Sequence, residues 1–145
     1  MRVVEQILSL KNGVLAALAV AGGAVVAGLG GWDIALETLV WCMVADYLTG
    51  MMVAGVFKKS AKSADGTMSS RAGFRGLCKK AAILLAVLVA AQVDTLTGGS
   101  YVRSAVVFFF VGNEGLSILE NMGLMGVPYP PFLKDALEVL REKKG

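Results

Sequence analysis

The chain of 145 residues combines 56% hydrophobic residues with 17% charged ones, whereas a typical soluble domain is about half apolar and about a quarter charged. It carries a net charge of +3 and no histidine, so it lacks the commonest metal ligand and the usual acid–base group of neutral pH. Cys42 and Cys78 lie in or beside apolar runs without CxxC spacing, which favours two small buried side chains over a disulfide or a metal site. We expect a membrane protein that is not an enzyme, with no cofactor and no metal.

The first apolar run, residues 12–32, holds 21 consecutive uncharged residues. A helix of this length covers about 30 Å, which is the hydrocarbon thickness of a bilayer. A cleaved signal peptide is the alternative, but the run is long for one and a second apolar stretch follows almost at once. The run therefore predicts a first spanning helix.

The second predicted helix, residues 34–57, follows a turn at Trp32 and Asp33, where Asp33 is a plausible N-cap. Glu37 lies in the first turn, where the helix dipole tolerates a carboxylate. Asp46 lies about 20 Å along the axis from Asp33, which places it near the middle of the membrane.

A basic stretch, residues 58–80, contains seven Lys or Arg residues and one acid, which gives it a local charge of +6. Nucleic-acid binding is the alternative interpretation, but Phe74 is the only aromatic residue among these bases. Short basic loops between apolar runs are typical of the cytoplasmic side of a membrane. We therefore expect a cytoplasmic loop and no nucleic-acid partner.

The third apolar run, residues 81–93, is too short to span the membrane alone. It becomes long enough as a helix over 76–96 if Lys79 and Lys80 extend to the headgroups. Asp94 and the TLTGGS stretch then form a turn. A fourth helix is predicted over 101–125, where GVPYPP ends it, and the tail, residues 126–145, has leucines at the spacing of a short amphipathic helix.

These elements predict an all-α membrane protein with about four transmembrane helices, three being the alternative, in a single integral domain over 1–145. With the basic loop in the cytoplasm, both termini are cytoplasmic as well. Of the 14 Lys and Arg residues, 13 then lie on that side, and Arg103 alone lies outside or near the outer face.

The fourth helix carries a polar stripe within an arc of about 120°, and Arg103 shares its face about 16 Å away. The stripe consists of Asn113, Glu114, Ser117, Glu120 and Asn121. A charged group at the bilayer centre costs about 2.5–3.5 kcal/mol, so the stripe is expected to face a partner helix, a wet cavity or Arg103 of a neighbouring copy. Alternatively, the span ends at Gly112 and both glutamates lie among the headgroups.

Small residues repeat every four positions on the first two helices, which predicts close helix packing within the chain or between copies. On the first helix they are Gly23, Ala27 and Gly31, with Ala24 and Gly28 beside them; on the second they are Gly50 and Ala54.

Four stretches resemble, in order, the motifs of the toxin-secretion/phage-lysis holin family, which includes clostridial toxin-export holins. They are DYLTGMMVAG, SSRAGFRGLCKK, VDTLTGG and NEGLSILENMGLMGVPYP, and they fall within residues 46–131. The first apolar run carries no such motif.

The resemblance implies a phage or prophage holin that oligomerises in the host cytoplasmic membrane and forms lesions releasing an endolysin or a toxin. Its partners would be copies of itself, the lipid bilayer, and the functionally coupled endolysin or toxin. Beside the stripe, the candidate polar and assembly residues are Asp46, Gly50, Ala54, Asp94 and Arg103. The alternatives are a small ion channel or transporter subunit that uses intramembrane carboxylates, a membrane enzyme, and a structural subunit of a larger complex.

Overall fold

The computed structural model describes residues 1–142, and all of its regular elements within this range are helical. In chain order they are α1 (Arg2–Gly28), α2 (Ile34–Met52), the π-helix η1 (Val53–Phe57), α3 (Ser70–Thr97), α4 (Val102–Leu124) and α5 (Pro131–Glu142). Within residues 1–142, four helices are long and apolar enough to cross a membrane: α1, α2 continued by η1, α3, and α4. The prediction of an all-α membrane protein with four spans is confirmed, and residues 143–145 of the predicted tail lie outside the described range.

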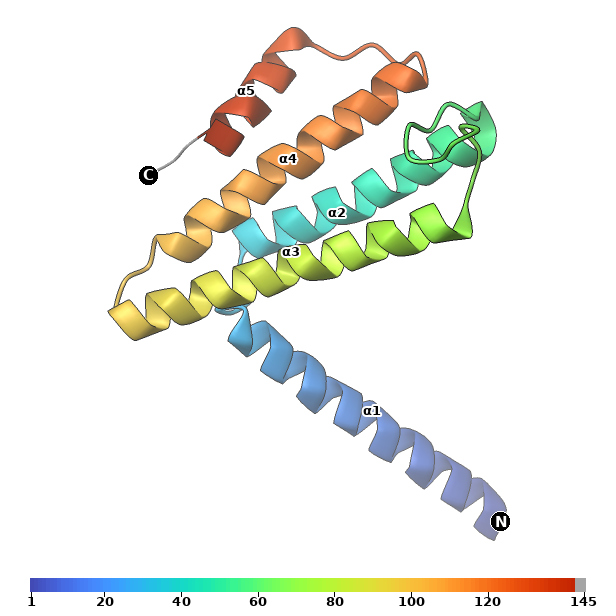
Figure 1. Cartoon of the computed structure of the whole chain (residues 1–145). Helices are drawn as coiled ribbons and strands as arrows, with labels where there is room; N and C mark the ends of the chain where they lie inside the picture. The colour runs from blue at the N-terminus through green and yellow to red at the C-terminus, as the bar shows by residue number, and fades with distance from the viewer. Residues whose placement is uncertain (143–145) are drawn as a thin grey trace.

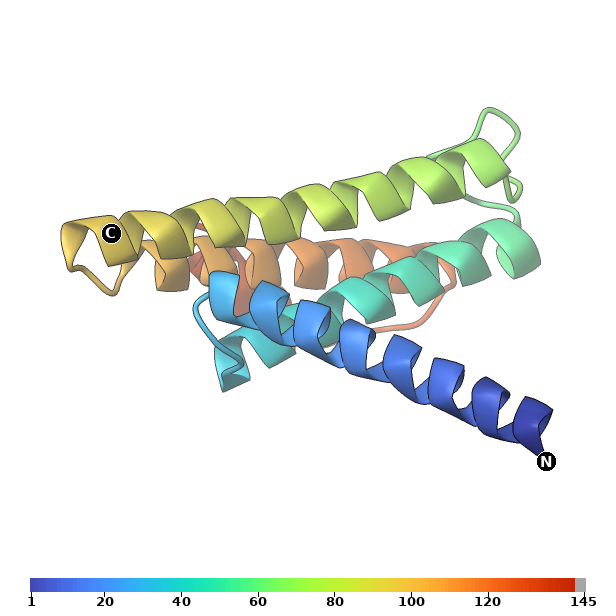
Figure 2. The same ribbon diagram turned by 90° about the horizontal axis from the view of Figure 1, so that it is seen from below.

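Three helices, α2, α3 and α4, run side by side as a bundle (Figures 1 and 2). Leu36 and Leu39 of α2, Val87 of α3 and Val107 of α4 are fully buried between them. α4 packs along both other helices, whereas α2 and α3 approach one another much less closely. This arrangement leaves room between α2 and α3 toward the basic loop.

Helix α1 diverges from this bundle and points away from it (Figures 1 and 2). None of its residues is buried, and it meets α3 only near its end, where Gln92 Nε2 donates to the Gly28 carbonyl at 2.9 Å. It begins ten residues before the predicted run. It ends four residues before the end of that run, because Gly30 and Gly31 have positive φ angles of 85° and 92°. Gly31 therefore lies in the turn and not on the small-residue face predicted for the first helix.

The basic stretch is a loop only as far as Ser69. The Ser69 hydroxyl accepts from the Ala72 backbone N–H at 3.5 Å and caps α3, which starts six residues before the predicted third helix. The second half of the basic stretch thus forms the first turns of α3. Cys78 is exposed on this helix, so the prediction of a buried side chain is wrong for Cys78, whereas Cys42 is half-buried.

The tail folds back as α5 along α4 (Figure 1). Two glycines of α4 permit this approach: a Cβ on Gly112 would lie 2.6 Å from the Leu137 carbonyl oxygen, and one on Gly115 would lie 2.7 Å from a Leu137 methyl carbon. The predicted amphipathic helix therefore packs on the fourth span through its leucine face.

Candidate functional site

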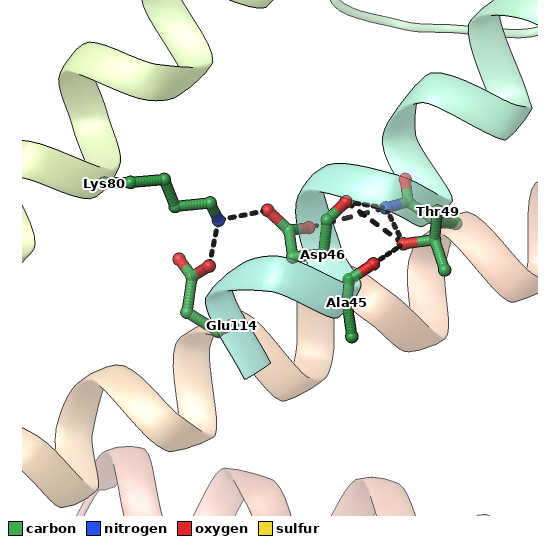
Figure 3. A network of polar contacts seen from close by, with 6 residues as sticks. Ala45, Asp46, Thr49, Lys80 and Glu114 are labelled. Carbon is green, nitrogen blue, oxygen red and sulfur yellow. Dashed lines mark hydrogen bonds and ion pairs between the residues drawn. The ribbon is translucent and has the colours of Figure 1, made fainter. Parts of the chain in front are cut away.

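Three charged side chains, one from each helix of the bundle, meet near mid-length of their helices (Figure 3). Asp46 lies twelve residues after the start of α2, Lys80 ten after the start of α3, and Glu114 twelve after the start of α4. Lys80 Nζ donates to Asp46 Oδ2 and to Glu114 Oε2. We name these three residues the mid-span cluster.

The mid-span cluster is removed from solvent, with side-chain exposures of 14% for Lys80, 8% for Asp46 and 6% for Glu114. Burial of a charge is costly unless an opposite charge compensates it, which explains why the three side chains converge. Lys80 shares its face of α3 with Ile83 and Val87, which are both buried in the core. The prediction that Lys80 extends to the headgroups is therefore wrong, because two carboxylates at the same depth bind it inside the bundle.

An amide and a hydroxyl extend this polar contact along α2. Asn121 Nδ2 of α4 donates to Thr49 Oγ1 at 2.9 Å and lies 3.4 Å from Asp46 Oδ1. Thr49 Oγ1 in turn donates to the Ala45 carbonyl at 2.8 Å (Figure 3). Each oxygen of the Asp46 carboxylate therefore has its own donor.

The predicted polar stripe of α4 divides between the interior and the surface. Glu114 and Asn121 are buried, Ser117 is half-buried, and Asn113 and Glu120 are exposed. The stripe is wider than the strip of α4 that α2 and α3 cover, so only part of it reaches the bundle interior. The helix also continues unbroken through Gly112 to Leu124 and does not end at that glycine.

A cavity of about 390 Å³ adjoins the mid-span cluster, between α2, α3, α4 and the basic loop. Gly50 and Ala54, the predicted assembly residues of the second helix, line it. A Cβ on Gly50 would lie 3.8 Å from both Asn121 Nδ2 and Lys62 Nζ of the same chain. The small-residue face of α2 is thus directed at the interior of its own chain.

At the other end of the bundle, a second charged group joins three helix ends; we name Asp33, Asp94 and Arg103 the turn cluster. The Asp94 carboxylate accepts from the backbone N–H groups of Val102 at 3.0 Å and Arg103 at 2.9 Å, so it caps α4. Arg103 Nη1 donates to Asp33 Oδ2 at 2.6 Å, and its other guanidinium nitrogens donate to the Leu29 and Gly31 carbonyls.

The turn cluster fixes the tight turn between α1 and α2. Asp33 Oδ1 accepts from the Leu36 backbone N–H at 2.8 Å, so the predicted N-cap of α2 is present. The Arg103 guanidinium, and then this N–H, lower the pKa of Asp33 below its ordinary 3.8. A Cβ on Gly30 would lie 2.8 Å from the Arg103 side chain, so the turn needs glycine there. Arg103 is fully engaged within its own chain and does not approach the stripe.

Sequence reasoning missed Lys80 and Lys62 as site residues. For Lys80 a signal existed: Asp46 and Glu114, predicted in two different spans, require a cation at their depth, and Lys80 adjoins the third apolar run. Lys62 carried no comparable signal, because only the folded loop brings it to the cavity.

The family model described as the bacteriophage holin family matches residues 23–142. The chain belongs to the bacteriophage holin family. The family resemblance of the four motifs is thereby confirmed, and the match extends beyond them at both ends. It covers the bundle, both charged clusters and α5 of this holin-family chain, and leaves most of α1 outside.

Relatives of this holin-family chain occur in bacteria and in a phage. A protein of Clostridium perfringens named as an uncharacterised 14.9 kDa protein is 43% identical over 79% of this chain and 83% of its own length. An uncharacterised protein of Listeria monocytogenes is 39% identical over 78% of this chain and 76% of its own. A probable holin of Bacillus phage phi105 is 33% identical over 72% and 73%. No solved structure matches the chain.

Proposed function

We propose that this chain is a phage or prophage holin whose copies assemble in the cytoplasmic membrane of the host bacterium. The assembly opens lesions through which an endolysin or a toxin-sized protein crosses. The observation that carries the proposal is the holin-family match over residues 23–142, together with the relative named a probable holin of a phage.

The mid-span cluster supports a helix bundle whose interior is shielded from lipid before lysis and faces water once the lesion has formed. Two carboxylates share one lysine, which leaves one formal negative charge among the three side chains. Lipid-facing helices do not keep such groups, whereas an aqueous lumen hydrates them. In the proposal the closed bundle hides these charges from lipid, and the assembled lesion exposes them to water.

Self-association is assigned to α1, because it is the span that the rest of the chain leaves uncovered. Cβ atoms on Gly22 and Gly23 would meet nothing within 4 Å, in contrast to Gly50 on α2. Small residues let spanning helices approach closely. The proposal therefore moves the contact between copies from Gly50 and Ala54 to the face of α1 around Gly23 and Ala27.

The proposed topology places both termini and the basic loop in the cytoplasm, from the distribution of 13 of the 14 basic residues. Reporter fusions at Met1 and Gly145 measure it. An outside signal from either terminus would contradict the four-span topology.

Inducible expression with and without a co-expressed endolysin tests the function. We expect culture turbidity to fall abruptly only when both proteins are present, because the lesion gives the endolysin access to the wall. An endolysin without the holin is the control and should leave turbidity unchanged. Absence of lysis with both proteins in the cell would contradict the holin role.

The buried carboxylates also support a second candidate, a small ion channel or transporter subunit. Proteoliposomes separate the two functions, since a channel conducts ions and retains an enclosed folded protein. Release of that protein favours the holin, and ion-selective conductance without release favours the channel.

A further inference from the structure

The cavity beside the mid-span cluster opens among the basic residues at the loop end of the bundle. It is bounded by α2 and η1, by the first turns of α3, by the middle of α4 and by loop residues 60–69. Its volume of about 390 Å³ lies within the range of small-molecule sites in proteins. The proposed lesion does not require this cavity.

Positive charge dominates the cavity wall. Lys62, Arg75, Lys79 and Lys80 line it against two acids, so the four cations and two anions leave a formal charge of +2. Lys80 is bound by both acids, and within residues 1–142 the other three have no carboxylate within 4.0 Å. Lys62 Nζ reaches down from the loop to within 3.8 Å of the Cβ position on Gly50. Lys62, Arg75 and Lys79 therefore outnumber the one negative charge that the mid-span cluster leaves at this cavity.

The start of α3 adds to this positive potential. Ser69, Ala72 and Gly73 belong to the cap and first turn of the helix, and all three line the cavity. The N-terminus of a helix carries partial positive charge, which favours an anion beside it; the Ala72 and Gly73 N–H groups themselves donate to Ser69. Tyr47 places its hydroxyl at the same wall, 3.4 Å from the Cβ position on Gly73. A phosphate group suits this combination of three free cations, a helix start and a hydroxyl.

Apolar side chains share this cavity with the polar ones. Met51, Ala54 and Met68 line it, and Leu85 and Val89 are 61% and 60% exposed farther along α3. A free anion makes no use of such surface, whereas a lipid covers it with its acyl chains. Basic pockets between spanning helices on the cytoplasmic side bind the head groups of anionic lipids. We propose that this cavity binds the phosphate of an anionic phospholipid, with the acyl chains along the exposed face of α3.

The test uses the full chain, purified in a mild nonionic detergent, with fluorescent phosphatidylglycerol as the probe and phosphatidylcholine as the neutral comparison. We expect saturable binding of phosphatidylglycerol and much weaker binding of phosphatidylcholine. Replacing Lys62, Arg75 and Lys79 together with Gln should weaken binding on the order of a hundredfold, since each basic residue near a lipid surface contributes about a factor of five. Lys62→Gln alone should cost about fivefold and serves if the triple variant does not fold.

The matched control replaces Lys58, Lys59 and Arg71 with Gln, which removes the same charge from the same stretch at exposed positions that do not line the cavity. It should bind within twofold of the wild type. Equal losses in the two triple variants would overturn the site in favour of diffuse surface attraction. Equal binding of both lipids would overturn the need for an anion, and displacement of the lipid by inorganic phosphate or glycerol 1-phosphate at similar concentration would assign the cavity to a free anion.

Discussion

The mid-span cluster and the turn cluster contain the same charges, two aspartates or glutamates and one cation, yet their surroundings differ. In the turn cluster, Asp33 caps α2 and Asp94 caps α4, so two helix N-termini share the negative charge with Arg103. In the mid-span cluster no helix terminus is present, and Lys80 alone serves two carboxylates. In the turn cluster the carboxylates satisfy backbone N–H groups at two helix starts. In the mid-span cluster the lysine compensates buried negative charges that an apolar core would not contain. From this comparison we expect the turn cluster to stabilise the fold, and we propose that the mid-span cluster acts in function.

The largest effect is expected for Lys80→Met. It leaves Asp46 and Glu114 facing one another without a cation, and breaking a buried ion pair costs about 3–5 kcal/mol. We expect a reduced free energy of unfolding in a denaturing-detergent titration and no lysis. Lys79→Met is the control, because Lys79 is exposed one residue earlier and its loss should change stability by less than about 1 kcal/mol.

Glu114→Leu separates the role in lysis from the role in stability. It leaves Lys80 with Asp46 as a one-to-one pair, so we expect normal membrane abundance and unchanged stability within about 1 kcal/mol. Lysis should nevertheless be lost, because the proposed lumen loses a charge from α4. Phe109→Leu, on the half-exposed apolar side of the same helix, should lyse on schedule. Timely lysis by Glu114→Leu at wild-type abundance would reduce the mid-span cluster to a structural feature.

Arg103→Met tests the other half of the comparison. It removes the guanidinium hydrogen bonds to Asp33 and to two carbonyls, for an expected loss of about 1.5–3 kcal/mol. The loss should be smaller than for Lys80→Met, because the Asp33 side chain is 50% exposed and water can replace its partner. At matched membrane abundance the lysis time should stay that of the wild type. A strong lysis defect at matched abundance would show that both clusters act in the same process.

The smallest effect is a pH dependence of the turn cluster. Arg103 lowers the pKa of Asp33 in the folded chain below its ordinary value of 3.8. The ionised carboxylate therefore stabilises the folded chain at pH values above 3.8. This contribution is lost as the pH falls below 3.8 through the folded value. The stability difference between the wild type and Arg103→Met should therefore narrow from pH 5 downward. If the stability difference stays constant down to pH 2, the Asp33 carboxylate is not the partner through which Arg103 stabilises the fold.

Much of the helical plan could be predicted from local sequence. The second and fourth helices lie within a residue or two of the expected bounds, because Asp33 caps one and the Pro-rich GVPYPP stretch follows the other. The first and third helices start earlier than their uncharged runs. Helix formation depends on capping and backbone hydrogen bonds, and charged residues do not end a helix that extends beyond the hydrocarbon.

The sequence by itself determined four apolar helices, a basic loop, an amphipathic tail and carboxylates at mid-span, because each follows from local periodicity and composition. Only the tertiary structure decided the partners of those carboxylates. Lys80 is 34 residues from both Asp46 and Glu114, and nothing local distinguishes it from Lys79, which stays exposed. The choice depends on which face of α3 packs against α2 and α4, where the two carboxylates lie buried and need a cation.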